Sequence, residues 1–352
     1  MTRENTKKLY VGNVPIGGGA PVAVQSMCNT KTGDPEATLA QMRALKTAGC
    51  DVIRVAVPDM VAAEGLREIM KEAPMPVVAD IHFDHRLALA AAEAGVDAIR
   101  INPGNIGDKS RVEAVARACA AKSIPIRVGV NAGSIEKGIL AKYGTPTPEA
   151  LVESAAGELE ALYSLGFYDV ALSVKASDVT TTVAAYRLAA ERFDCPLHVG
   201  VTEAGTSYGG LVNSAVGIGT VLMEGIGDTI RVSLTADPLE EVRAGIAILK
   251  SCGLRKGGVR FVSCPTCGRT RIDLISLAKA AEERLASIDR DITVAVMGCE
   301  VNGPGEAREA DFGMAGGNGF GSLFRKGQVV RTKIPEAELL DALMEMIRSA
   351  EP

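Results

Sequence analysis

The chain has 352 residues, of which 47% are hydrophobic and 23% are charged. This balance is typical of an ordered globular protein with a sizeable core, and it excludes disordered and fibrous classes. The net charge of −5, the absence of Trp and the 4% aromatic content offer neither a basic patch nor a stacking platform, so we expect no nucleic-acid partner.

No secretory signal is recognisable at the N-terminus, which reads MTRENTKK. The uncharged and mostly apolar stretch at about residues 208–223 is shorter than the roughly 20 apolar residues that a bilayer span requires. We therefore expect a cytoplasmic protein without a membrane segment.

Short, nearly continuous apolar runs recur before about residue 250, and each is followed by a helix-like stretch rich in Ala, Leu, Glu and Lys. Such runs are typical of parallel strands that are buried on both faces. The predicted strands are 22–27, 51–57, 76–81, 98–102, 125–130, 169–174, 196–201 and 228–234.

Turn and cap residues agree with this alternation. Glycines follow four of the helical patterns, where a left-handed C-cap is favoured: Gly49, Gly95, Gly166 and Gly227. An Asp or a Pro begins helices near residues 34, 148 and 237. Eight strand-helix units predict a (β/α)8 TIM-type barrel, with an open doubly wound parallel sheet as the alternative.

The remainder of the chain changes character after Gly257 and Gly258. Strands are predicted at 259–262 and 292–296, and helices at 273–286 and 335–350. We therefore expect a small α+β domain at 256–352 after a barrel at 1–255. The glycine-rich segment 313–321 is expected to be a mobile loop, because no Lys-Ser/Thr pair completes a phosphate-binding motif there.

Five basic residues lie in the apolar barrel strands: Arg54, Arg100, Arg127, Lys175 and Arg231. A buried cation is costly unless it is paired, so each must meet either a carboxylate from a neighbouring strand or an anionic ligand. The aspartates three positions before three of these arginines lie on the opposite strand face. Because the active site of such a barrel lies at the strand C-termini, we predict a diphosphate-bearing ligand there.

Further polar residues follow the same strands: Asp80, His82, Asn102, Asn131, Thr202, Glu203 and Ser233. Glu203 is a candidate acid/base residue, with an ion pair to an arginine as the alternative. His82, next to Asp80, is a candidate functional histidine, whereas His85 and His198 are interpreted as structural.

Three cysteines have the spacing of a metal site: Cys264 and Cys267 form a C-x-x-C pair, and Cys299 follows the next predicted strand. Zinc usually requires a fourth Cys or a His, and this domain has none, so three thiolates favour a 4Fe-4S cluster with one iron held by an oxygen donor such as Glu306. The other five are expected to be small core residues: Cys28, Cys50, Cys119, Cys195 and Cys252.

The motifs around these cysteines read FVSCPTCGRT at 261–270 and VMGCEVNGPGEA at 296–307. The barrel adds VQSM at 24–27, ADIHF at 79–83, RINPGN at 100–105, RVGVN at 127–131 and VTEAG at 201–205. Together these motifs, which cover essentially the whole chain, resemble the two-domain bacterial form of the 4-hydroxy-3-methylbut-2-enyl diphosphate synthase family of the non-mevalonate isoprenoid pathway.

The resemblance implies a reductive ring opening and dehydration of 2-C-methyl-D-erythritol 2,4-cyclodiphosphate, with two electrons passing through a 4Fe-4S cluster. It implies Cys264, Cys267, Cys299 and Glu306 as cluster ligands and Glu203 as the acid/base residue. The implied substrate-binding residues are Arg54, Arg100, Arg127 and Lys175, assisted by His82, Asn131, Arg231, Ser233 and Asn302.

The resemblance also implies partners. Flavodoxin or ferredoxin would donate the electrons, and the chain would form a homodimer with the active site between subunits. Two other classes remain open from the residues: a non-redox barrel transferase for a phosphorylated substrate with a structural zinc domain, and a non-catalytic iron-sulfur carrier. The carrier is disfavoured, because it normally has four cysteines per cluster and no use for five cations.

Overall fold

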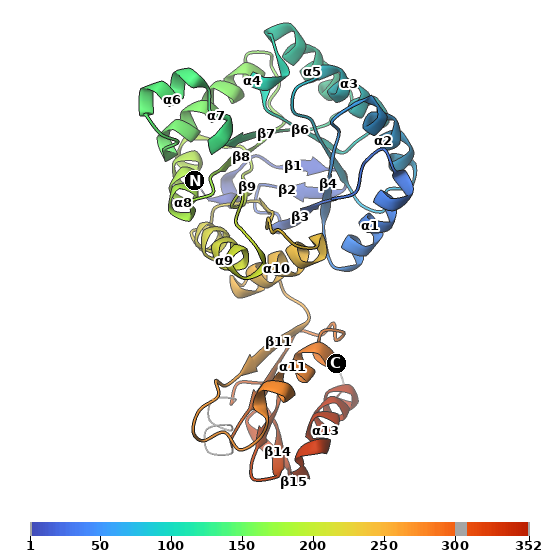
Figure 1. The fold of residues 1–352 in the computed structure, drawn as a ribbon, viewed down its shortest axis with the longest axis vertical. Coiled ribbons are helices and arrows are strands. Elements are labelled where there is room, and N and C mark those ends of the chain that lie inside the picture. Colours follow the sequence, from blue (N-terminus) through green and yellow to red (C-terminus); the bar gives the residue numbers. More distant parts are fainter. Residues whose placement is uncertain (1, 300–307, 351–352) are drawn as a thin grey trace. The chain divides into compact units, whose positions relative to one another are not determined.

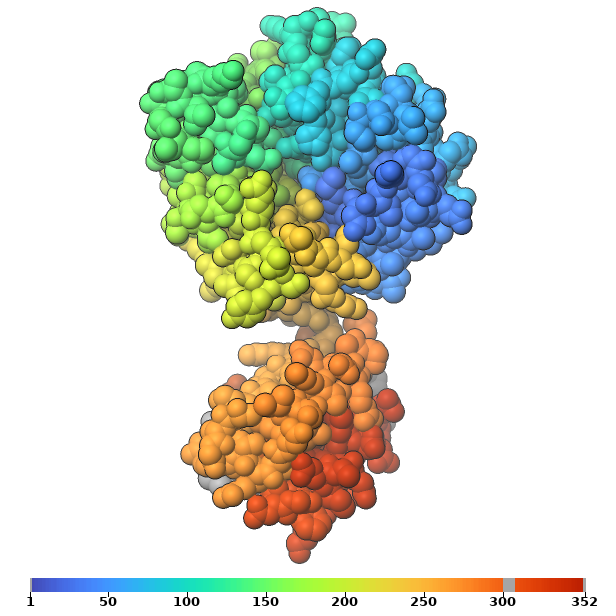
Figure 2. Space-filling model, viewed as in Figure 1, coloured from blue at the N-terminus to red at the C-terminus, as the bar shows by residue number. Residues whose placement is uncertain are grey.

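The structure, a computed structural model, describes residues 2–299 and 308–350. The chain divides into two compact units, Met1–Arg255 and Lys256–Pro352. In the first unit, a ring of helices surrounds a ring of strands (Figure 1). The space-filling view shows successive segments of this unit packed side by side around the ring, from blue through green to gold (Figure 2).

Eight parallel strands form the inner ring, in the order β8-β7-β6-β5-β4-β3-β10-β9. Their bounds are β3 Ala23–Met27, β4 Val52–Ala56, β5 Val77–Asp80, β6 Ala98–Ile101, β7 Ile126–Asn131, β8 Val170–Lys175, β9 His198–Val199 and β10 Thr229–Ile230. A parallel bridge between Leu172 of β8 and Leu197, just before β9, joins the two ends of the sheet. The predicted barrel is therefore confirmed, and the open doubly wound sheet is wrong.

The helices of the first unit are α1 Pro35–Thr47, α2 Met60–Glu72, α3 His85–Ala94, α4 Pro103–Ile106, α5 Lys109–Ala121, α6 Lys137–Tyr143, α7 Pro148–Tyr163, α8 Val179–Arg192, α9 Ser207–Met223 and α10 Pro238–Ser251. The predicted helix starts are present: the side chains of Asp34 and Asp237 accept hydrogen bonds from the first turns of α1 and α10, and α7 begins at Pro148, with Thr147 as a cap that the sequence analysis did not name. Each such cap contributes about 1 kcal/mol. None of the described helices is both long and apolar enough to cross a membrane.

The aspartates at the starts of the strands bind backbone groups of neighbouring strands and do not pair with the arginines of the strands. Asp51, Asp97 and Asp228 each accept the backbone N–H of a residue at or next to a neighbouring strand, at 2.8, 2.7 and 2.7 Å. This placement agrees with the expectation that they lie away from the arginine side chains. The aspartates thus satisfy backbone donors at the N-terminal end of the barrel, and the cations need other partners.

A β-hairpin that the sequence did not reveal closes this N-terminal end. Its strands are β1 Leu9–Val11 and β2 Val14–Ile16. Their apolar side chains form one cluster with four barrel-strand residues, Val52, Val78, Ala98 and Ala171. The first unit is therefore plugged at the strand N-termini, which leaves the C-terminal ends as the place for a site.

The second unit is the predicted small α+β domain. Its five-stranded sheet has the order β11-β12-β13-β14-β15. The elements are β11 Val259–Ser263, α11 Leu274–Leu285, β12 Ile292–Met297, β13 Phe312–Gly316, β14 Phe320–Arg325, β15 Gln328–Pro335 and α13 Glu336–Ser349. β11, β12 and β13 are parallel, and β14 and β15 continue the sheet antiparallel. Apolar residues of α11 and α13 share one core with the sheet.

The expectation of a mobile loop at 313–321 is wrong, because most of this segment belongs to β13 and β14. The glycines serve close packing instead. A Cβ on Gly313 would lie 2.2 Å from the ring of Phe324, and one on Gly316 would lie 2.4 Å from Ile272. Since these glycines replace the apolar side chains that mark a strand, the sequence pattern resembled a loop.

Candidate functional site

The five predicted cations converge inside the barrel. Arg54, Arg100 and Arg127 lie on β4, β6 and β7, Lys175 ends β8, and Arg231 follows β10 directly. Their side chains line one cavity of about 110 Å³. Its complete lining is Arg54, Asp80, His82, Arg100, Arg127, Gly129, Asn131, Ser173, Lys175, His198, Thr202, Arg231 and Ser233.

The structure thus brings together eight of the nine residues that the sequence predicted to bind substrate. The ninth, Asn302, lies outside the described residues, as does Glu306. Asp80 and Thr202 are strand-end polar residues in the sequence analysis, which does not place them among the substrate-binding residues. Ser173 and His198 lie within barrel strands. A polar residue in an otherwise apolar strand is the signal that would have found Ser173, whereas His198 is a residue that the sequence pattern led us to interpret as structural.

One buried carboxylate serves two of the arginines. Asp80 Oδ1 lies 3.2 Å from Arg100 Nη1, and Asp80 Oδ2 lies 3.6 Å from Arg54 Nε. Burial opposes ionisation of Asp80, but Arg54 and Arg100 outweigh it and lower the pKa of this carboxyl below its ordinary value. Asp80 is therefore a fixed anion between two strands that carry cations.

The other cations are less well compensated. Glu241 of α10 lies 3.6 Å from Arg231, and Arg127 Nη1 donates to the amide oxygen of Gln25 at 2.6 Å. Among the described residues, Lys175 has no ion-pair partner. The alternative that every arginine meets its own carboxylate is thus correct only in part. Only Asp80 and Glu241 lie within ion-pair distance of the five cations, so basic side chains outnumber nearby carboxylates by three.

Because like charges repel, this excess of basic side chains disfavours the protonated form of each of them. Burial, followed by the surrounding guanidinium groups, lowers the pKa of Lys175 and that of Arg127 well below their ordinary values. Burial also lowers the pKa of Arg54 to about 10. A multivalent anion in the cavity would supply the missing negative charge, and arginine forks suit phosphate oxygens.

Replacing Lys175 by Met should have opposite effects on stability and on anion binding. Removal of a buried, unpaired charge should raise the unfolding free energy by about 1 to 2 kcal/mol. The same change should weaken binding of inorganic diphosphate by roughly a hundredfold, because a charged contact is lost. Thermal unfolding and calorimetric titration measure the two quantities. The exposed Lys250→Met is the control, and a Lys175→Met protein that binds diphosphate like the wild type would contradict this account of the cavity.

Glu203 lies next to this cavity but is not among the residues that line it. Its side chain is exposed, whereas the preceding Thr202 does line the cavity. Glu203 has a φ of +52°, a left-handed conformation that residues other than glycine adopt rarely. Such strain occurs often at functional sites, where the surrounding structure holds a side chain in place.

The three cysteines among the predicted metal ligands follow two adjacent strands of the second unit. Cys264 comes directly after β11, and Cys299 comes two residues after β12, at the same end of the sheet. The N–H of Gly298 donates to Cys264 Sγ at 3.2 Å. Cys267 is exposed, and its pKa is lowered, first by a backbone hydrogen bond from Arg269. No three acidic, His or Cys side chains within residues 2–299 and 308–350 already form a metal-binding group.

The remaining cysteines behave as the expected core residues. Four are buried, and burial raises the thiol pKa of each to about 12: Cys28, Cys50, Cys119 and Cys195. Cys252 is partly buried, and its thiol pKa is also raised by burial. A thiol with such a pKa is a poor metal ligand at neutral pH, because metals bind the thiolate.

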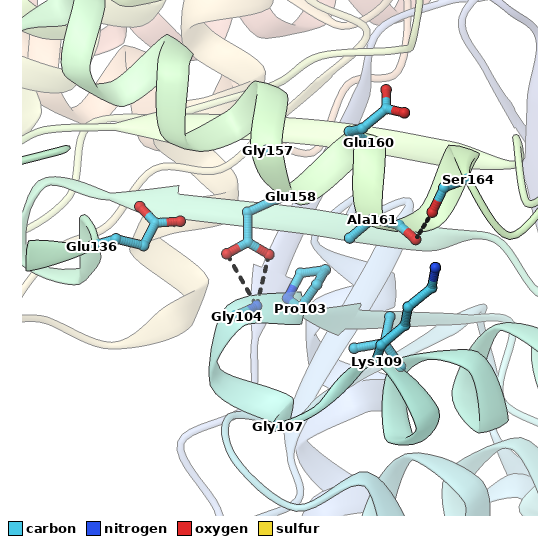
Figure 3. Close-up of a pocket in the computed structure, with 11 residues that line it drawn as sticks. Pro103, Gly104, Gly107, Lys109, Glu136, Gly157, Glu158, Glu160, Ala161 and Ser164 are labelled. Atoms are coloured by element: carbon cyan, nitrogen blue, oxygen red, sulfur yellow. Dashed lines mark hydrogen bonds between the residues drawn. The ribbon is translucent and has the colours of Figure 1, made fainter. Parts of the chain in front are cut away.

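A second pocket, of about 380 Å³, lies between α7 and the segment after β6 (Figure 3). Glu158 points from α7 into this pocket, and its two carboxylate oxygens accept the N–H of Gly104 at 3.0 and 2.9 Å. A Cβ at position 104 would lie 2.6 Å from the carboxylate, so a glycine is needed there. The contact secures the segment that follows the strand of Arg100.

Glu158→Gln should flatten the pH dependence of stability. Burial raises the pKa of Glu158 from 4.5 to about 7, so the folded chain holds a proton that the unfolded chain has lost between these pH values. The contribution of Glu158 to the unfolding free energy is therefore fully present below pH 4.5. It falls by about 3 kcal/mol in total as the pH rises toward 7. Unfolding of both proteins across this window measures the difference. Glu160→Gln, in the same pocket but exposed, should keep the wild-type slope; an equal slope in the Glu158 variant would contradict the assignment.

Comparison with known proteins gives two family matches. Residues 6–246 match the GcpE TIM-barrel domain, and residues 260–349 match the GcpE protein C-terminal domain. A protein of Geobacter sulfurreducens is 59% identical over 342 residues, covering 97% of each chain. One of Clostridium perfringens is 56% identical and covers 99% of this chain and all of its own. Both are named 4-hydroxy-3-methylbut-2-en-1-yl diphosphate synthase (flavodoxin).

Among solved structures, a dihydropteroate synthase from Stenotrophomonas maltophilia is similar to 70% of this chain and covers 98% of its own. The TM-score is 0.50 and the sequence identity is 16%, so the likeness shows the fold alone. That fold is the barrel.

Proposed function

Because the chain belongs to the GcpE family, we propose that it catalyses the reductive ring opening and dehydration of 2-C-methyl-D-erythritol 2,4-cyclodiphosphate to 4-hydroxy-3-methylbut-2-enyl diphosphate. One observation carries this proposal beyond the family match. Five cations line one cavity and only two carboxylates lie within ion-pair distance of them, which is the charge balance that a diphosphate ligand requires.

The cavity residues bind and orient the substrate. Arg54, Arg100, Arg127 and Lys175 hold the diphosphate oxygens, and His82, Asn131, Arg231 and Ser233 add hydrogen bonds. Asp80 keeps two of the arginines in place before the anion arrives. Because these side chains are fixed by strands and largely buried, little reorganisation accompanies binding.

Glu203 moves a proton in this scheme. Opening the ring breaks a carbon–oxygen bond to the diphosphate, and the dehydration removes a hydroxyl group of the substrate as water. The hydroxyl group needs a proton to leave as water, so a proton donor must lie beside the phosphate site. Glu203 directly follows a residue of the cavity wall and is held in a strained backbone conformation. Asn302 is assigned to the substrate from the family pattern.

The second unit is proposed to hold a 4Fe-4S cluster through Cys264, Cys267, Cys299 and Glu306. The donor set fits such a group: two of the thiols follow adjacent parallel strands, the third has a lowered pKa, and a backbone N–H already contacts Cys264 Sγ. When bound, the cluster supplies the electrons that the ring opening consumes.

Two protein partners follow from the same assignment. The names of the relatives include flavodoxin, so we assign a flavodoxin as the electron donor, with a ferredoxin as the alternative. The chain is also proposed to form a homodimer with the active site between subunits. α9 supports self-association, because it has no charged residue and exposes several apolar side chains, among them Tyr208 at 85% and Met223 at 79%.

A turnover assay tests the function. Anaerobically purified protein is given the cyclic diphosphate and an artificial low-potential reductant, and the linear diphosphate product is measured. Iron, acid-labile sulfide and zinc are determined on the same sample. Product formation with stoichiometric iron and sulfide is expected; stoichiometric zinc without sulfide would instead support the barrel transferase, which the comparisons do not favour.

A further inference from the structure

A buried histidine that the proposed mechanism does not use lies in the wall of the cation cavity. His198, the first residue of β9, is 1% exposed and lines the cavity. Its Nδ1 lies 2.7 Å from the hydroxyl oxygen of Thr229, its register partner on β10. Its backbone carbonyl accepts a hydrogen bond from the Tyr186 hydroxyl at 2.6 Å. Thr229 therefore holds the imidazole, and Tyr186 holds the backbone that carries it.

The other ring nitrogen of His198 has no partner. Six buried side-chain nitrogen and oxygen atoms of the described residues lack a hydrogen bond, and three of them belong to residues that line this one cavity. These three are His198 Nε2, Arg127 Nη2 and Arg231 Nε. A buried polar group without a partner is unfavourable, and such groups are rare. Three of them in one cavity indicate a ligand that accepts hydrogen bonds.

The surroundings keep the imidazole neutral. Burial, followed by Arg127, Lys175, Arg54 and Arg231, lowers the pKa of His198 well below its ordinary value. A neutral imidazole has one N–H, and its position depends on the partner of the other nitrogen. The Thr229 hydroxyl can donate to Nδ1 or accept from it, so it permits either tautomer. The group that meets Nε2 therefore decides which tautomer is present.

We propose that His198 is a substrate-binding residue that donates a hydrogen bond from Nε2 to a phosphoryl oxygen of the bound diphosphate, while the Thr229 hydroxyl donates to Nδ1. This inference rests on the proposed function. It adds a hydrogen bond without adding another charge to a cavity that already has an excess of cations. Thr229 is a positioning residue, because it acts only through the imidazole.

Variants at the two positions test the inference. His198→Leu should weaken binding of inorganic diphosphate about tenfold and raise KM more than it lowers kcat. His198→Gln, whose amide nitrogen can replace Nε2, should retain most of the affinity. Thr229→Val should weaken binding and Thr229→Ser should restore it. His85→Leu, outside the cavity, is the control, and wild-type affinity in His198→Leu would overturn the assignment.

A measurement on the wild type does not depend on whether the variants fold. The chain has three histidines, so ¹⁵N spectra of labelled imidazoles can be assigned with single substitutions. Adding inorganic diphosphate should place the proton of His198 on Nε2, and a complex in which Nε2 carries no proton would refute the proposal. Diphosphate binding is independent of turnover, so a protein that binds diphosphate without forming product would contradict the function and leave the assignment of His198 standing.

Discussion

Glu203→Gln is expected to lower turnover of the cyclic diphosphate by about a thousandfold while leaving the bound iron unchanged. Gln keeps the size of the side chain and the strained backbone at φ +52°, so the change removes only the ionisable group. Diphosphate affinity should stay close to that of the wild type, because the side chain of Glu203 does not line the cation cavity. The loss should therefore appear in kcat.

Product formation, iron content and the visible absorption spectrum measured on one preparation check this expectation. Glu191→Gln, an exposed carboxylate of α8, is the control and should leave all three unchanged. If the Glu203 variant lost its iron, Glu203 would be a structural residue; if it turned over normally, another group would supply the proton.

Cys264→Ser is expected to abolish both the cluster and the reaction. Cys264 is the first residue after β11, and its sulfur contacts the backbone beside Cys299, so it joins the two strand ends that carry the proposed ligands. A serine hydroxyl ionises far less readily than a thiol and is a poor ligand for iron. Iron and acid-labile sulfide should fall to background.

The matched control for this change is Cys252→Ser, in the first unit. Its thiol has a raised pKa and belongs to the first unit, which carries none of the proposed cluster ligands, so iron and sulfide should stay at wild-type levels. Circular dichroism of both proteins shows whether the fold persists. A Cys264→Ser protein that keeps four irons would remove this cysteine from the ligand set.

The barrel could be predicted because both faces of its strands are buried, which leaves an apolar run for each strand. The hairpin Leu9–Ile16 could not, because its residues resemble any short surface strand and its role depends on the cluster that it forms with the barrel interior. The strands at 313–321 were missed because glycines occupy positions where bulky partners leave no room for a Cβ.

For the candidate site, the sequence was sufficient to predict the cations but not the residues that contact them. Cations in apolar strands are unusual enough to be noticed singly, and the barrel brings them together. Their partners depend on strand register and on helix packing, so the shared role of Asp80 and the contact of Glu241 with Arg231 could not be read from the sequence. His198 was interpreted as structural, because a lone histidine in an apolar run has the same pattern whether or not one ring nitrogen is free.

The hairpin of β1 and β2 also has a kinetic consequence. Since it seals the barrel at the strand N-termini, the cation cavity, which we propose as the substrate site, is reached from the other end. The proposed substrate and product are both diphosphates that would bind the same cations, so one must depart before the next can enter. Product should therefore inhibit competitively with substrate, and its release contributes to the rate of each cycle.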